Sequence, residues 1–509
     1  MILAVLLLTA AGTAVWACVP AQPVRGTAPD APPVKAKGDP AAGRNVFRFE
    51  TLGTERFWTD AVRLPQGLAA EKVTPLGLLD MGLSLDAEAL PADLKEAFAA
   101  EFKTDGSADK APKLNDPAAT AKLIAANAVI GLVPKGGKVG VTCALCHTIT
   151  DGSAFEVKGK GSVGKRLDGR TAHHLNLGRL FASAANSRAL YPLLQLQDGN
   201  KTIGRAPKGL TADSTEKEVD AYFRNPEFYP VGTLDSTFDG HGNGTVIMPV
   251  FRQDLAAPFS SGGESLTFAD SANRTFTAFL DLTVFLTPEG RAFLKMTNGD
   301  AGLRIADDYA KVLKDTGVTG YPFVTAKVTG EVGKSPTPLG RRVDEKKLTD
   351  LTAFCEGLAA PPGVVTDAAA VERGRKLFEA NCTKCHNVDA LKPVPPTIVD
   401  MKTLFPGYAP KILADRKSPQ SAVQDAPGGF DDHVVVFDAS GGGKPRGFAL
   451  PLLLDLARKP VFLHDGSVKG LDALFDPARG ETAPHPVYVK EAGARADVVA
   501  FLKSLGSKE

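Results

Sequence analysis

The sequence has almost no net charge. Its 59 lysines and arginines nearly balance its 58 aspartates and glutamates, which leaves a formal charge of +1 at pH 7. A protein that binds nucleic acid usually presents a basic surface, so this balance argues against a nucleic-acid partner. Hydrophobic residues make up 43% of the chain and charged residues 23%, which is typical of a soluble globular protein. A length of 509 residues indicates two or three domains.

Cysteine is scarce as well, with 6 residues in the chain, yet most of them fall in two copies of one motif. The motif is Cys-x-x-Cys-His, and its copies read CALCH from Cys143 to His147 and CTKCH from Cys382 to His386. A structural zinc site would use two neighbouring CxxC pairs, but these pairs lie far apart and each has its own histidine. A thioredoxin-like site would need a strand before each pair, whereas the second copy follows a helical pattern.

The spacing of this motif suits a planar cofactor. Residues three apart on a helical turn face the same way, so both cysteines of one copy can reach one ligand. CxxCH is the attachment motif of c-type haem, in which the two thiols form thioethers and the histidine binds the iron. We therefore expect two covalently bound haem c groups. The expected attachment residues are Cys143, Cys146 and His147 for the first haem, and Cys382, Cys385 and His386 for the second.

Two further short patterns also occur twice. GRNVF at 43–47 resembles GRKLF at 374–378, and DLTAFCEGL at 350–358 matches DVVAFLKSL at 497–505. Each nonamer has apolar residues at helical spacing behind an aspartate that can cap a helix. The repeat predicts two related helical units, 43–360 and 364–509, each opening with a Gly-Arg-x-x-Phe helix and containing one CxxCH motif.

Cys355 lies within the first nonamer, at the position where the second copy has Leu502. This match predicts a buried thiol that packs like a small hydrophobic residue. A disulfide with Cys18 is the alternative in an oxidising compartment.

The first residues read MILAVLLLTAAGTAVWACVP, an apolar run of signal-peptide length that is too short for a secure membrane span. We expect residues 1–17 to be a signal peptide and the protein to be periplasmic. Cys18 would then be the first mature residue, where a bacterial lipoprotein carries its lipid, although Trp16 fits such a site poorly. Residues 18–42 are rich in proline and alanine, which predicts a tether with no fold of its own.

The second unit resembles a class I cytochrome c domain. VERGRKLFEANCTKCH has a Gly/Phe helix leading into CxxCH, and the terminal DVVAFLKSLG is similar to the crossing C-terminal helix of that domain. In addition, KPVFLHDGSVKGLDALFDP at 459–477 is similar to a late segment of the dihaem cytochrome c peroxidase superfamily, which includes bacterial peroxidases and dihaem rubber oxygenases. The resemblance implies a mainly α fold of two class I cytochrome c-like domains, the first with large loop-rich insertions.

The sixth iron ligands decide what each haem can do. A haem with two strong protein ligands transfers electrons, whereas an open sixth position can bind peroxide or oxygen. The segment around His464 is similar to the one that carries the distal histidine in the rubber oxygenases, so the resemblance implies His464 as the ligand at the second haem. Met401, His433 and His485 are alternatives there.

At the first haem we expect Met248, in TVIMPVF, as the sixth ligand, because class I cytochromes present their methionine thioether from a Met-Pro step. His173 and His174 follow the first CxxCH motif closely and are rival candidates.

The glycine-rich segment DSTFDGHGNGT around His241 is a candidate calcium site. Its candidate ligands are Asp235, Asp239 and Asn243. The dihaem peroxidases hold an interdomain calcium ion, but this segment lacks EF-hand spacing, so an ordinary turn is the alternative.

Together these features predict an exported dihaem c-type cytochrome that carries out electron transfer, with peroxide or oxygen chemistry at one haem. A dedicated dihaem peroxidase or oxygenase is one alternative, and a non-catalytic redox relay between protein partners is the other. The expected partner is a small redox protein. Trp58, the one tryptophan after the signal segment, precedes both motifs, whereas the peroxidases place a bridging tryptophan between them. No residue stands out as the acid or base for peroxide cleavage, so catalytic residues stay unassigned.

Overall fold

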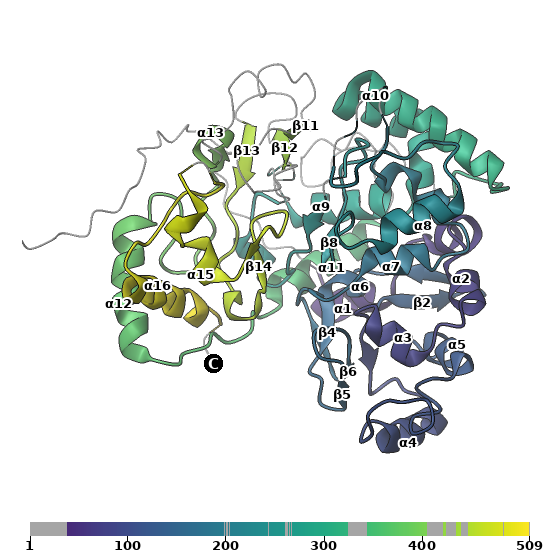
Figure 1. Cartoon of the computed structure of the whole chain (residues 1–509), viewed down its shortest axis with the longest axis horizontal. Helices are drawn as coiled ribbons and strands as arrows, with labels where there is room; N and C mark the ends of the chain where they lie inside the picture. Colours follow the sequence, from purple (N-terminus) through teal and green to yellow (C-terminus); the bar gives the residue numbers. More distant parts are fainter. Residues whose placement is uncertain are drawn as a thin grey trace, which may run out of the picture.

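The computed structural model describes residues 38–507 except 198, 200–201, 203, 243, 260–262, 264, 266, 324–343, 405–420, 424–433, 439–445 and 482. The described chain forms two lobes, a first lobe of residues 38–360 and a second lobe of residues 361–507 (Figure 1). The predicted signal peptide and Cys18 lie outside the described residues. The predicted tether ends earlier than expected, because helix α1 (Pro40–Phe49) already begins at Pro40, where Asp39 caps it by accepting a hydrogen bond from the Ala41 amide.

In the first lobe, α1 crosses α11 (Glu345–Gly357) at very close range. A Cβ atom placed on Gly43 would lie 1.9 Å from the backbone oxygen of Asp350, so only glycine fits at this crossing. One turn further along, the rings of Phe47 and Phe354 pack with their centres 5.4 Å apart. Backbone proximity and an aromatic pair thus fix how the two helices meet.

The second lobe contains a helix pair with the same contacts, formed by α12 (Ala368–Asn381) and α16 (Ala492–Ser504). A Cβ atom on Gly374 would lie 1.9 Å from the backbone oxygen of Asp497, and the ring centres of Phe378 and Phe501 are 5.3 Å apart. The four helices expected from the repeated patterns are therefore present, and each pair meets at a glycine, an aspartate carbonyl and two phenylalanines.

The segment between α1 and α11 contains more regular structure than the expected loop-rich insertions. Its helices are α2 (Leu64–Ala70), α3 (Pro75–Asp80), α4 (Ala92–Glu101), α5 (Pro117–Ala125), α6 (Ala144–His147), α7 (Leu177–Ala182), α8 (Glu216–Arg224), α9 (Phe268–Arg274) and α10 (Pro288–Asp315), with short π- or 3-10-helical turns at Phe57–Ala61, Ser187–Leu193, Gln253–Leu255, Thr275–Phe279 and Leu282–Leu286. These elements bury a large hydrophobic core around Phe57, Trp58 and Phe181. Among the described residues, no helix combines the length and apolar character needed to cross a bilayer.

Strands are short and form small sheets. In the first lobe they are β1 (Leu85–Asp86), β2 (Leu132–Lys135), β3 (Lys138–Val141), β4 (Thr148–Thr150), β5 (Phe155–Glu156), β6 (Ser162–Gly164), β7 (Arg166–Asp168), β8 (Thr233–Leu234) and β9 (Thr245–Val246). The second lobe has β10 (Ile398–Asp400), β11 (Ser421–Val423), β12 (Val434–Asp438), β13 (Arg446–Ala449), β14 (Val461–Phe462) and β15 (Val468–Lys469), with α13 (Met401–Leu404), α15 (Leu471–Leu474) and 3-10 turns at Leu456–Arg458 and Pro477–Arg479. An antiparallel sheet in the order β10-β13-β12-β11 was not expected from the sequence.

Replacing Gly374 by alanine should destabilise the second lobe. The added Cβ would lie 1.9 Å from the Asp497 oxygen, and overpacking of this kind costs about 1–3 kcal/mol of unfolding free energy. Gly493→Ala in α16 is the matched control, because nothing lies within 4 Å of its Cβ position and alanine favours a helix. Denaturant unfolding followed by circular dichroism should give G374A a lower midpoint than the parent and G493A an equal or higher one. A G374A midpoint equal to that of the parent would contradict the close crossing.

Candidate cofactor centres

The first CxxCH motif forms a tight turn after the hairpin of β2 and β3. Cys143 precedes α6, and the amide of His147 donates to the carbonyl of Cys143 at 3.2 Å. Burial raises the pKa of the Cys143 and Cys146 thiols to about 12. Burial also lowers the pKa of His147 to about 4, so this imidazole is neutral at pH 7, as a metal ligand must be.

The second motif begins where α12 ends, since α12 stops at Asn381 and Cys382 follows directly. The amides of Cys385 and His386 both donate to the carbonyl of Cys382, at 3.2 and 3.0 Å. Burial lowers the pKa of His386 to about 4, so it too is neutral at pH 7. The two motifs therefore adopt the same kind of turn, and each presents a neutral histidine.

Both turns face one cavity of about 1310 Å³. Its lining includes all six expected attachment residues, Cys143, Cys146, His147, Cys382, Cys385 and His386. Most of the other lining side chains are apolar, among them Trp58, Phe276 and Leu454. Pockets for ordinary small molecules measure roughly 300–1,000 Å³, so this cavity has room for a larger planar group at each turn. The residues present thus fit covalently held haem.

His485 lies opposite His386 in this cavity. The centres of the two imidazole rings are 6.4 Å apart. Two imidazoles that bind one metal ion from opposite sides have ring centres roughly 6 Å apart, because metal–nitrogen bonds are about 2.0–2.1 Å long. His485 also has a left-handed backbone with φ of 54°, which is unusual for a residue other than glycine and is held by a 2.8 Å hydrogen bond to the Leu404 carbonyl. The geometry therefore favours His485, one of the sequence alternatives, as the partner of His386.

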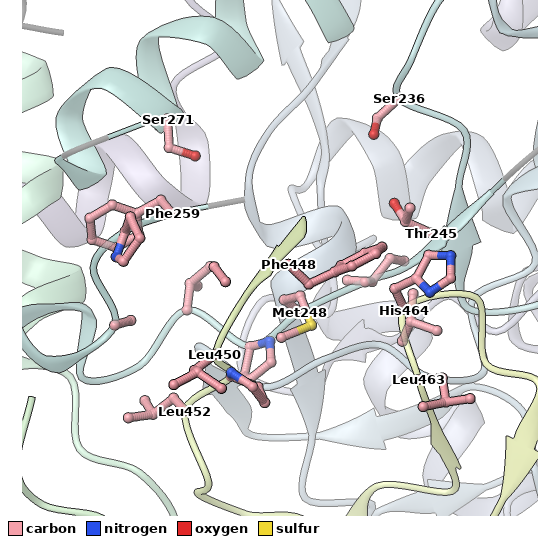
Figure 2. A pocket seen from close by; sticks show the side chains of 18 of the residues that line it. Ser236, Thr245, Met248, Phe259, Ser271, Phe448, Leu450, Leu452, Leu463 and His464 are labelled. Atoms are coloured by element: carbon pink, nitrogen blue, oxygen red, sulfur yellow. The ribbon is translucent and has the colours of Figure 1, made fainter. Parts of the chain in front are cut away.

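His464 lies at the boundary between the lobes. Its carbonyl accepts a 2.7 Å hydrogen bond from the amide of Val246 in the first lobe, and its ring centre is 5.0 Å from that of Phe448. Figure 2 shows the His464 ring in the same part of the cavity as Phe448 and Met248. Iron ligation by His464 at the second centre stays a prediction.

Met248 lies in a segment that runs along the first CxxCH turn. We call residues 245–250 the strap. The amide of Val250 donates to the Gly169 carbonyl at 2.9 Å, and the amide of Gly169 donates to the His147 carbonyl at 2.8 Å. The backbone of Met248 lies beside the imidazole of His147. This contact raises the pKa of His147 and so offsets part of the lowering that burial causes. The strap is thus on the His147 side of the centre, which does not fit Met248 as the ligand opposite His147. A Met-Pro step in the sequence does not reveal which side of a haem it faces.

The other candidate ligands are less well placed or lie outside the description. Neither His173 nor His174 lines the cavity, and His174 is exposed. His433 and the side chain of Met401 are outside the described residues. Cys355 is fully buried with a free thiol, which confirms its prediction as a core residue.

The expected calcium ligands contact other groups. The hydroxyl of Thr237 lies 3.0 and 2.8 Å from carboxylate oxygens of Asp235 and Asp239, and Nδ1 of His241 lies 3.1 Å from the second Asp239 oxygen. Asn243 is outside the described residues. Over the part of the chain that is described, no group of three or more His, Cys, Asp or Glu side chains is arranged to hold a metal ion. The buried carboxylates are explained by these local contacts, as in the alternative of an ordinary turn.

Comparison with known proteins finds a family match within the second lobe. Residues 371–435, which include the second CxxCH motif, match the sequence model of the cytochrome c family. No curated protein matches the chain significantly. Among solved structures, hydrazine synthase of Kuenenia stuttgartiensis pressurized with xenon is similar to 52% of this chain and 74% of its own, with 16% identity and a TM-score of 0.26. The chain therefore contains a cytochrome c domain, a domain that binds haem c covalently and serves haem-based electron transfer.

His485→Ala should change the haem of the second lobe from a six-coordinate, low-spin form to a high-spin or ligand-binding form. The physical reason is that removal of the imidazole opposite His386 leaves the iron with one protein ligand. Absorption spectra of the oxidised holoprotein measure the change, with His464→Ala as the comparison. An unchanged spectrum in H485A, together with a high-spin spectrum in H464A, would show that His464 is the ligand.

Proposed function

We propose that this protein is an exported dihaem c-type cytochrome that transfers electrons through two covalent haems. The observation that carries the proposal is that both CxxCH turns line the same cavity. Haem c supplies one-electron redox chemistry at the iron. Cys143 and Cys146 would hold the first haem and Cys382 and Cys385 the second, so that neither haem would be lost between turnovers. His147 and His386 would each provide a neutral nitrogen for one iron.

The two centres have different tasks. The second centre, where the ring centres of His386 and His485 lie 6.4 Å apart, would suit electron transfer, because two histidine ligands would leave no position for a substrate. It also lies beside exposed residues, Thr383 and Lys384, within its own motif. A small redox protein can approach at this edge and exchange electrons with the second haem.

The first centre is the one that binds peroxide or oxygen. Within the described chain, no aromatic or imidazole ring contacts the ring of His147, and the strap places Met248 on the His147 side. The lining contributed by the first lobe is largely apolar and includes Trp58, Leu177, Phe181, Phe238, Ile247 and Phe276. Such walls exclude bulk water and admit a small neutral molecule. With electron transfer at the second centre and peroxide or oxygen binding at the first, the more specific proposal is an oxidoreductase of the dihaem peroxidase or oxygenase kind.

A redox relay between protein partners is the second candidate. It is favoured by the boundary between the lobes, where the 2.7 Å hydrogen bond from Val246 to His464 links the strap of the first centre to the second lobe. A relay needs two fully ligated haems, whereas the enzyme needs one open position. The ligation state of the first iron therefore separates the two functions.

Export belongs to the same proposal. Residues 1–17 form an apolar run of signal-peptide length, and Cys18 stands where a lipoprotein would carry its lipid. The proline- and alanine-rich segment that follows would hold the lobes away from a membrane surface. The proposed compartment is the periplasm, where a small redox protein is the electron partner.

The holoprotein should carry two haems per chain, one on each motif. Intact-mass measurement should show the mass of two haems on the parent chain and of one haem on each double variant, C143S/C146S and C382S/C385S. Cys355→Ser is the control, because this buried thiol lies outside both motifs, and it should keep both haems. A parent with one haem, lost only in C382S/C385S, would contradict the first centre.

A further inference from the structure

Lys459 is a half-buried cation in the wall of the cavity. It lies between the 3-10 turn at Leu456–Arg458 and β14, and it lines the cavity together with Phe462 and His464. Desolvation by the surrounding protein atoms lowers the pKa of the Lys459 amine to about 8. At neutral pH the amine is still mostly protonated, so the cavity wall contains a positive charge.

No anionic partner for this charge is found in the described part of the chain. The ammonium of Lys459 makes no ion pair and no side-chain hydrogen bond there, and it lies over the ring of Phe462, whose centre is 5.5 Å away. A partly desolvated charge loses some of its hydration, and a cation–π contact offsets about 0.5–2 kcal/mol of that loss. An anion that enters the cavity would therefore find in Lys459 a cation that no described carboxylate pairs.

His173 of the first lobe lies close to Lys459 but adds no charge at pH 7. Burial, and after it the charge of Lys459, lower the pKa of His173 to about 4. Arg170 is half-buried nearby and interacts electrostatically with both Asp455 and Arg458. Asp455, the acidic group of this neighbourhood, is already bound to Arg458 at 2.6 Å. An incoming carboxylate would thus meet the positive charges of Lys459 and Arg170, while Asp455 is already paired with Arg458.

We propose that Lys459 binds a carboxylate in the cavity, and that this carboxylate is a propionate side chain of one of the two haems. The inference rests on the proposed function, since it requires haem in the cavity. Each haem would bring two propionates into the cavity that Lys459 lines, and these groups would supply carboxylates there. Lys459 then acts as a positioning residue: it holds the haem edge and, as a nearby positive charge, stabilises the reduced iron relative to the oxidised iron.

Potentiometric titration of the holoprotein tests this role. Lys459→Met should lower the reduction potential of one haem by about 59 mV, which corresponds to a tenfold change in the equilibrium constant of a one-electron reduction. The potential of the other haem should stay nearly unchanged. Lys459→Gln should lower it as well, because it also removes the charge, and it serves if K459M does not fold. Lys459→Arg should retain the parent potential. Lys469→Met is the matched control, because Lys469 lies exposed on β15 in the same segment.

Potentials of K459M and K459Q equal to those of the parent would overturn the proposal. Titrations with and without added acetate or phosphate separate the two sources of anion. If the parent potential depends on the added anion and that of K459M does not, the site binds a diffusible anion and the propionate assignment is wrong. Haem content is measured on the same samples. A single haem per chain would contradict the proposed function. The change in reduction potential that K459M causes at the remaining haem could still be measured and would test the role of Lys459 separately.

Discussion

The close crossing of two helices in each lobe holds the cofactor turns in place. At Gly43 and Gly374 the backbones approach so closely that a Cβ atom would lie 1.9 Å from an aspartate carbonyl. In the second lobe, the direction of α12 then fixes Cys382, the next residue after the helix. In the first lobe, Phe47 and Phe354 share a core with Ala144 of the first motif, and the hydroxyl of Thr142 donates to the Arg48 carbonyl at 3.1 Å. The helix pairs thus determine where each histidine faces the cavity.

The boundary between the lobes gives the two centres a common environment. The strap packs along the first CxxCH turn, and its Val246 amide donates to His464 of the second lobe. A second backbone link runs from the amide of Val394 to the Leu255 carbonyl at 2.8 Å. A shift of one lobe would therefore change the surroundings of both CxxCH turns. Direct backbone links of this kind are consistent with electron exchange between the proposed haems.

Short-range patterns in the sequence predicted part of this structure. The CxxCH turns depend on residues three or four apart, and the four crossing helices depend on apolar spacing, so both could be identified locally. The side of the centre on which Met248 lies could not, because that depends on how the strap packs against Gly169 and His147. The sheet containing β12 was missed although its run of valines at 434–436 is a strand signal.

The partner of His386 shows the same limit. His464 was favoured because its segment resembles a known one, while His485 lies in a short Pro-His-Pro sequence without a helical or strand pattern. Its position opposite His386 depends on a left-handed backbone and on a hydrogen bond to Leu404, both products of the folded lobe. The sequence supplied His485 as one candidate, but the 6.4 Å ring separation was needed to select it.

The central claim is that the second iron has two protein ligands and the first has an open position. Low-temperature electron paramagnetic resonance of the oxidised holoprotein, before and after addition of hydrogen peroxide, tests it most directly. We predict one low-spin signal that peroxide leaves unchanged and one high-spin signal that peroxide alters. Two low-spin signals that are both indifferent to peroxide would contradict the claim and identify the protein as a redox relay.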